Sequence, residues 1–176
     1  MIRTLVNVIG FQAGWFAAVL GAAQGMPWLG MIVVPIVLVV HVALSPDRKA
    51  EVMLILSAGA LGFVIDTGLI VAGIFTPIVY LFPYPFSPPW MVLLWMIFST
   101  AINVSLQKLH GHYLLSAVLG SVGGPAAYYS GAKLGATTAI PGTSDMLILA
   151  VAWAVAVPAL FWNAGRINEK YIEETH

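Results

Sequence analysis

Long apolar runs alternate with short polar breaks along almost the whole chain. Each run is close to the roughly 20 residues that a helix needs to cross an apolar membrane core of about 30 Å. The pattern therefore predicts an all-α, polytopic transmembrane bundle of six helices, forming a single integral membrane domain over residues 1–176. The predicted helices are Thr4–Ala22, Pro27–Leu44, Glu51–Phe75, Trp90–Gln107, His112–Leu134 and Asp145–Asn163.

The basic residues in the breaks predict how this bundle is oriented. Only Lys133 falls on one side of the predicted membrane. The other six Lys and Arg fall on the opposite side, at Arg3, Arg48, Lys49, Lys108, Arg166 and Lys170. Because cytoplasmic loops carry the excess of Lys and Arg, we expect both the N and C termini to be cytoplasmic.

Small residues repeat at helical spacing within the runs, as is typical of helices that pack closely in lipid. In the third run Gly59, Asp66 and Gly73 lie seven residues apart. Asp66 shares the glycine face of its helix, so we expect it to point into the bundle rather than toward lipid.

Asp66 alone among the charged residues lies deep inside an apolar run. A carboxylate at membrane depth costs roughly 2.5–3.5 kcal/mol on insertion scales, so it needs a partner, a proton or a function. Depths counted at about 1.5 Å per residue place Tyr128 or Ser99 within direct hydrogen-bonding reach of Asp66. Asn103, in the inner half of its helix, is a further candidate partner. His41 lies deeper toward the cytoplasmic side, where a water or a tilted helix would be needed to join it to Asp66.

The polar and aromatic side chains around Asp66 are candidate ligand-binding residues, because small-molecule sites are mostly apolar pockets with a few convergent polar groups. They are Asp66, Asn103, Tyr128, His41, Gln12, Trp95 and Ser99. Asp66 and His41 are also candidate general acids or bases. A structural alternative is that Asp66 is a neutral acid hydrogen-bonded to Tyr128 or Asn103. The expected ligand is a lipid-like or apolar small molecule, and the surrounding partner is membrane lipid.

Two segments interrupt the regular pattern. Thr76–Pro89 holds five prolines and four aromatic residues, which excludes a regular helix. We expect it to form an interfacial loop or a lid at the outer face. The Gly123-Gly124-Pro125 sequence predicts an interruption or a kink at mid-membrane in the fifth helix.

Composition supports the membrane assignment and excludes several functions. The chain is 60% hydrophobic and 8% charged, has zero net charge and contains no cysteine. No basic patch is present to bind nucleic acid, and thiolate metal sites and cysteine nucleophiles are excluded. His110 and His112 alone are too few to hold a metal, and the sequence indicates no cofactor.

Several motifs together resemble a family of small bacterial inner-membrane proteins known as domain of unknown function 2878. They are Phe11-Gln12, Trp15-Phe16, His41, Asp66, Pro88-Pro89-Trp90-Met91, Trp95, Asn103, Gly124-Pro125, Tyr128 and the segment 131–136. The resemblance implies the inner membrane of a Gram-negative bacterium and brings no established activity.

The length, the six helices, and Ala13 and Ala17 at four-residue spacing are also similar to the substrate-binding components of energy-coupling-factor vitamin transporters. Three functions therefore stay open from the sequence. The chain is an enzyme or binding protein for a lipid-like molecule, a transporter component, or a non-catalytic partner of a lipid-modifying enzyme. The sequence does not indicate an oligomeric state.

Overall fold

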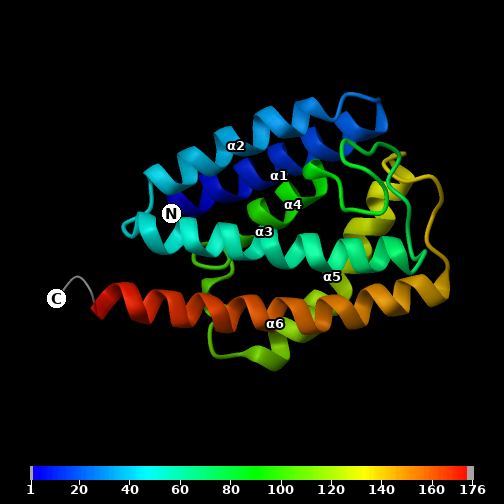
Figure 1. Cartoon of the computed structure of the whole chain (residues 1–176). Helices are drawn as coiled ribbons and strands as arrows, with labels where there is room; N and C mark the ends of the chain where they lie inside the picture. The colour runs from blue at the N-terminus through cyan, green and yellow to red at the C-terminus, as the bar shows by residue number, and fades with distance from the viewer. Residues whose placement is uncertain (1, 174–176) are drawn as a thin grey trace.

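The computed structural model describes residues 2–173 as a bundle built only of helices (Figure 1). The six predicted α-helices are confirmed. They are α1 (Ile2–Ala23), α2 (Trp28–Ala43), α3 (Arg48–Val71), α4 (Pro89–Ser99), α5 (Tyr113–Lys133) and α6 (Thr143–Glu173), with a short 3₁₀ helix, η1 (Gln107–Leu109), before α5.

The helices form two layers around α4. Helices α1 and α2 pair with each other, and α3 packs beside α6, while α4 contacts α1, α2 and α3 (Figure 1). Helix α5 packs on α6 and lies at the back of the bundle. The first and last described residues lie at one end, called here the termini end. The opposite end, called here the loop end, carries segments 72–88 and 134–142.

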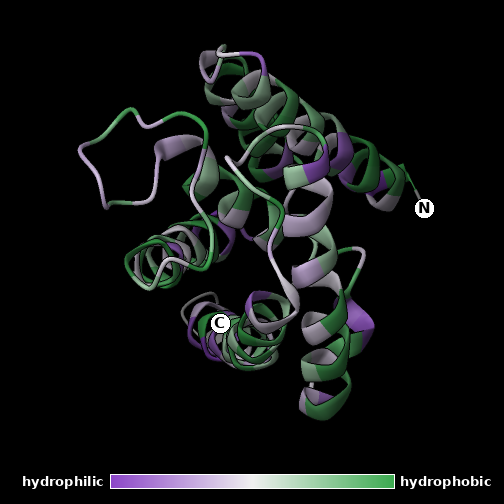
Figure 2. Cartoon of the chain, turned by 90° about the vertical axis from the view of Figure 1, so that its right-hand side faces the viewer, coloured by the Kyte–Doolittle hydropathy of each residue, from purple (hydrophilic) through white to green (hydrophobic). Residues whose placement is uncertain are grey.

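Three described helices are long and apolar enough to cross a membrane, namely α1, α3 and α6 as far as Tyr171. Hydrophobic residues make up much of the helices seen from the loop end (Figure 2), and many large hydrophobic side chains are exposed. These features indicate a multi-pass membrane protein. The predicted second helix agrees with α2, which has 16 residues, to within one residue at each end. The predicted fourth helix was too long, because α4 has only 11 residues.

Helix α4 ends after Ser99 instead of continuing to Gln107, as the sequence had predicted. The backbone turns there into 3₁₀-type hydrogen bonds, such as Ala101 N–H to Phe98 O and Ile102 N–H to Ser99 O. The Asn7 amide of α1 donates to the freed carbonyl of Thr100 at 3.1 Å and to its hydroxyl at 3.0 Å. A buried side chain from another helix therefore compensates the early end of α4.

The predictions for the two irregular segments had different outcomes. The residues from Ile78 to Ser87 are not helical, as predicted, and they lie against α3. The Phe86 ring stacks on Phe63 with centroids 6.0 Å apart, and Ser87 N–H donates to the Thr67 hydroxyl at 3.1 Å. Helix α5 runs without interruption through Pro125, so the interruption is not found, and the kink stays a prediction.

Two clusters of buried hydrophobic residues form the core. One, at the loop end, includes Ile70, Phe75 and Trp90. The other, on the side of the termini end, includes Leu54 and Phe161. Tyr128 and Ile65 pack against both clusters. The side chain of Asp66 also lies at this junction.

Candidate functional site

Asp66 is fully buried between three helices, as its position on the glycine face of α3 predicted. Trp95 Nε1 of α4 donates to one carboxylate oxygen at 3.0 Å, and the Tyr128 hydroxyl of α5 donates to the other. Both oxygens therefore accept a hydrogen bond from a neutral donor. No ion pair involving Asp66 occurs within residues 2–171.

The donors are held by an aromatic stack that depends on two glycines. The rings of Trp95 and Trp153 lie parallel, with centroids 4.3 Å apart and an interplanar angle of 16°. A Cβ atom added at Gly62 would lie 2.0 Å from the Trp95 ring, and one at Gly124 would lie 2.1 Å from the Trp153 ring. Only glycine lets these two backbones approach the indole rings so closely.

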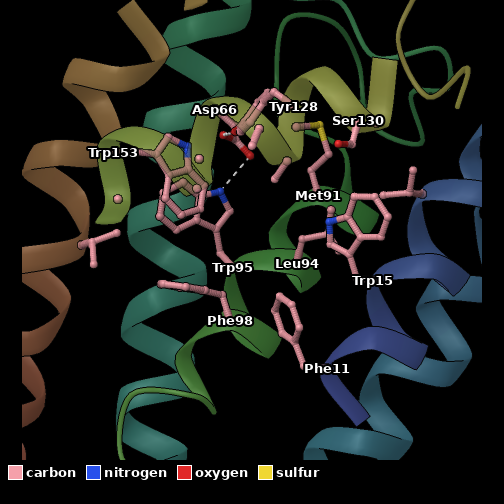
Figure 3. Close-up of a pocket in the computed structure, with 18 of the residues that line it drawn as sticks. Phe11, Trp15, Asp66, Met91, Leu94, Trp95, Phe98, Tyr128, Ser130 and Trp153 are labelled. Carbon is pink, nitrogen blue, oxygen red and sulfur yellow. Dashed lines mark hydrogen bonds between the residues drawn. The ribbon is translucent and has the colours of Figure 1, made fainter. Parts of the chain in front are cut away.

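A cavity of about 590 Å³ lies beside this stack, between α1, α4 and α5 (Figure 3). Aromatic, aliphatic and small residues form most of its wall. They include Phe11, Trp15, Leu94, Phe98, Gly120, Gly123 and Ala127. The polar groups in the wall include Asp66, Tyr128, Gln12 and Ser130. Among its described lining residues, Asp66 is the only one with an acidic or basic side chain.

The cavity wall includes residues that are exposed on the side of the bundle. Phe16 near the middle of α1 and Leu119 in α5 line it, and they are 47% and 48% exposed. At the loop end, α1 and α5 come together, and a Cβ at Gly131 would contact Val19 at 4.0 Å. An apolar molecule could thus enter between these helices directly from a surrounding bilayer.

A second group of polar side chains lies at the termini end, around Glu51. The Glu51 side chain is buried, and its Oε2 lies 3.0 Å from His41 Nε2. Its Oε1 accepts from Asn103 Nδ2 at 3.3 Å and lies 3.6 Å from Arg3 Nη2. We call these four residues the Glu51 cluster. A basin of about 970 Å³ next to it is also lined by Arg48, Lys49 and Lys108.

The loop before α5 extends the hydrogen bonds of the Glu51 cluster. His110 Nε2 lies 3.1 Å from Asn103 Oδ1, which also accepts from Asn168 Nδ2 at 3.1 Å. Partial burial lowers the pKa of His110, and a hydrogen bond with the Ile102 carbonyl opposes this shift in part. The side chains that converge here come from α1, α2, α3, α6 and the segment after α4.

The seven candidate ligand-binding residues therefore separate into three groups. Asp66, Tyr128, Trp95 and Gln12 line the cavity. Asn103 and His41 belong to the Glu51 cluster, so the predicted contact between Asn103 and Asp66 is absent from the described structure. Ser99 is buried and donates to its own helix at the Met96 carbonyl, 2.7 Å away, instead of reaching Asp66.

The sequence analysis did not predict two residues of these sites, Glu51 and Trp153. Glu51 follows Arg48 and Lys49 at a helix start, so its sequence position is typical of a solvated charge. The ten-residue spacing between His41 and Glu51 does not predict a contact unless the packing of α2 against α3 is known. Trp153 lies in an apolar run of α6 and resembles any core aromatic. The contact between Trp153 and Gly124 could not be predicted from the sequence of α5 or of α6 alone.

Comparison with known proteins agrees with the motif resemblance. The model of a family described as a protein of unknown function, DUF2878, matches residues 4–159. Neither the curated proteins nor the solved structures gave a match to this chain. Because the family model covers most of the chain, the chain belongs to the DUF2878 family.

Proposed function

We propose that this protein binds a lipid-like or apolar small molecule in the cavity between α1, α4 and α5. The observation that carries the proposal is the cavity itself. It measures about 590 Å³, which is within the range of ordinary ligand sites, and its wall is apolar except for a few polar groups around Asp66.

The exposed lateral part of the wall supports a ligand from the bilayer. Phe16 and Leu119 belong to helix surfaces that are exposed and apolar along their length, including Val8, Ile9, Leu115 and Val122. A molecule already dissolved in lipid would pass between these surfaces without crossing water. A water-soluble ligand would have to leave water before it reached them.

The polar end of the cavity supports selective binding rather than simple filling by lipid. The Asp66 carboxylate is held in one orientation by Trp95 and Tyr128, which are themselves packed against Trp153 and Phe75. Such a fixed polar group can orient a mostly apolar ligand and distinguish it from bulk lipid. Asn103 and His41 contribute to the Glu51 cluster and lie outside the cavity wall.

The test is to fill the cavity with a side chain. Gly123 lines it, and a Cβ added there meets no atom within 4 Å. Gly123→Phe should therefore displace the ligand without disturbing the helices. Gly68→Phe is the matched control, because Gly68 is an exposed helical glycine of α3 that also has open space and lies outside the cavity wall.

Each protein would be purified in mild detergent, and its bound small molecules extracted and measured by mass spectrometry. We expect about one molecule of a defined apolar species per chain in the wild type and in Gly68→Phe, as for a single-ligand pocket. Gly123→Phe should lose most of it while keeping the same melting temperature. Equal retention by both variants, or no defined species with the wild type, would overturn the proposal.

A further inference from the structure

The basin at the termini end carries an excess of positive charge. Its described lining residues include four basic side chains, Arg3, Arg48, Lys49 and Lys108, and two acidic ones, Asp47 and Glu51. Four basic groups against two acidic groups leave a formal excess of two positive charges. A concave surface lined mainly by one sign of charge attracts ligands of the opposite sign.

The two carboxylates of the basin already bind groups of the protein. The Glu51 side chain is buried, and its oxygens lie 3.0 Å from His41 Nε2 and 3.6 Å from Arg3 Nη2. The Asp47 carboxylate accepts from the Ala50 N–H at 3.0 Å and so caps the start of α3. Neither carboxylate is therefore placed to neutralise the lysines of the basin.

The lysines and Arg3 can reach an anion that enters the basin. Lys49 and Lys108 are exposed, and within residues 2–171 neither forms an ion pair. The Arg3 side chain is 36% exposed. Phosphate has a negative charge and several acceptor oxygens, so Lys and Arg side chains are its usual partners in proteins.

An apolar groove between α1 and α2 meets the basin at Arg3, which lines both. This α1–α2 groove has a volume of about 120 Å³. Four of its lining residues, Val6, Ile36, Val40 and Leu44, are between 40% and 59% exposed. An apolar chain lying in the groove would cover these side chains.

The α1–α2 groove runs along the helices, away from the termini end. Its wall extends from Arg3 to Gly10 on α1, which is about 10 Å at 1.5 Å per residue. Asn7 and His41 also line it, but both are buried and bind other side chains of the protein. Because α1 is long and apolar enough to cross a membrane, this direction leads from the lipid headgroups toward the acyl chains.

We propose that the termini end binds one anionic phospholipid, at a site separate from the cavity between α1, α4 and α5. The phosphate lies in the basin, and one acyl chain lies in the α1–α2 groove. A free phosphate compound would use the basin alone, whereas the meeting of basin and groove at Arg3 fits a molecule that joins a phosphate to an apolar chain. Basic pockets at the headgroup level of membrane helices typically bind anionic lipids.

The test measures binding to the delipidated protein in a non-ionic detergent by native mass spectrometry. The probes are phosphatidylglycerol, phosphatidylcholine with the same acyl chains, and glycerol phosphate as a competitor without chains. The key variant, Lys49→Gln/Lys108→Gln, removes two charges from the basin. The matched control, Arg166→Gln/Lys170→Gln, removes two charges from exposed residues of α6 outside both the basin and the groove.

We expect the wild type and the control to bind one phosphatidylglycerol about tenfold more tightly than phosphatidylcholine, because choline cancels the phosphate charge. Lys49→Gln/Lys108→Gln should lose most of this preference and bind phosphatidylglycerol about tenfold more weakly than the wild type. Equal binding of the two lipids by the wild type, or an equal loss in both double variants, would overturn the proposal. Displacement of the lipid by equimolar glycerol phosphate would assign the basin to free phosphate compounds and overturn it as well.

A second pair of variants tests the place of the acyl chain. Val40→Phe narrows the α1–α2 groove, and Val39→Phe puts the same ring on a neighbouring residue that is 68% exposed and outside the groove wall. Val40→Phe should weaken the binding of both phospholipids by about fourfold for each CH₂ group displaced. Val39→Phe should bind them as the wild type does. Equal affinities of the two variants would contradict a chain in this groove. The cavity shares no described lining residue with the basin or the groove, so none of these outcomes bears on the proposed cavity ligand.

Discussion

At the scale of single residues, Asp66 is both a structural and a chemical group. Its two oxygens join α3 to Trp95 of α4 and to Tyr128 of α5. Among the described residues, no other side-chain hydrogen bonds join α3 to both α4 and α5. The same carboxylate lies in the wall of the cavity. Substitutions at Asp66 can therefore separate its structural role from its role toward a ligand.

We expect Asp66→Leu to lower the free energy of unfolding by about 1–3 kcal/mol, because the buried Trp95 N–H would lose its acceptor. Asp66→Asn should stay within about 1 kcal/mol of the wild type, since its amide oxygen can accept from Trp95 and its NH₂ can donate to the Tyr128 oxygen. Equilibrium unfolding in a fixed detergent measures both values. Equal stability of Asp66→Leu and the wild type would show that the hydrogen bonds contribute nothing net.

The same asparagine variant tests whether Asp66 exchanges a proton in function. Asn cannot titrate, so Asp66→Asn should fold and yet fail to restore the membrane fatty-acid profile of a strain that lacks the protein. The wild type and Gly68→Phe serve as positive controls. Full restoration by Asp66→Asn would leave Asp66 with a purely structural role.

At the scale of elements, close approach between helix backbones and indole rings shapes the site. Gly62 of α3 and Gly124 of α5 lie on opposite sides of the Trp95–Trp153 stack. The stack belongs to the core cluster at the termini end, and Leu109 and Val157 of the same cluster also line the cavity. The glycine repeats in the sequence are thus packing positions for aromatic rings as well as for neighbouring helices.

Gly62→Ala should destabilise the fold by about 1–3 kcal/mol, because its Cβ would overlap the Trp95 ring and force the stack to shift. Gly68→Ala, six residues along the same helix, is the control. It has open space, and it should stabilise the protein by about 0.5–1 kcal/mol through the higher helix propensity of alanine. Thermal unfolding of both variants measures the contrast. Equal melting temperatures would show that the Trp95 ring adapts without cost.

At the scale of the whole molecule, the two ends of the bundle differ in character. The basin at the termini end gathers four of the six basic residues assigned to one side, namely Arg3, Arg48, Lys49 and Lys108. The loop end carries exposed aromatic residues such as Phe82 and Tyr84. Basic residues on the cytoplasmic side and aromatic residues at an interface are typical of inner-membrane proteins. We therefore expect the termini end to face the cytoplasm in a bacterial inner membrane.

Reporter fusions measure this orientation. A phosphatase that is active only in the periplasm should be inactive when fused after His176, which lies outside the described residues, and active when inserted near Phe86. A cytoplasm-active reporter at the same two positions should give the opposite pattern and serves as the control. Periplasmic activity after His176 would contradict the predicted orientation.

Hydrophobic periodicity in the sequence determined the class, the six helices and the inward direction of Asp66, because burial in lipid and burial in protein both follow local spacing. Depth counted along the helices gave Tyr128 as one of three candidate partners of Asp66, and the other two, Ser99 and Asn103, bond elsewhere. The tertiary structure decided which helices face each other. Only that pairing brings Glu51 to His41, assigns Asn103 to the Glu51 cluster, and places Trp153 against Trp95. The early end of α4 likewise depends on Asn7, a residue 93 positions away in the chain, because a freed carbonyl is tolerated only where a distant donor reaches it.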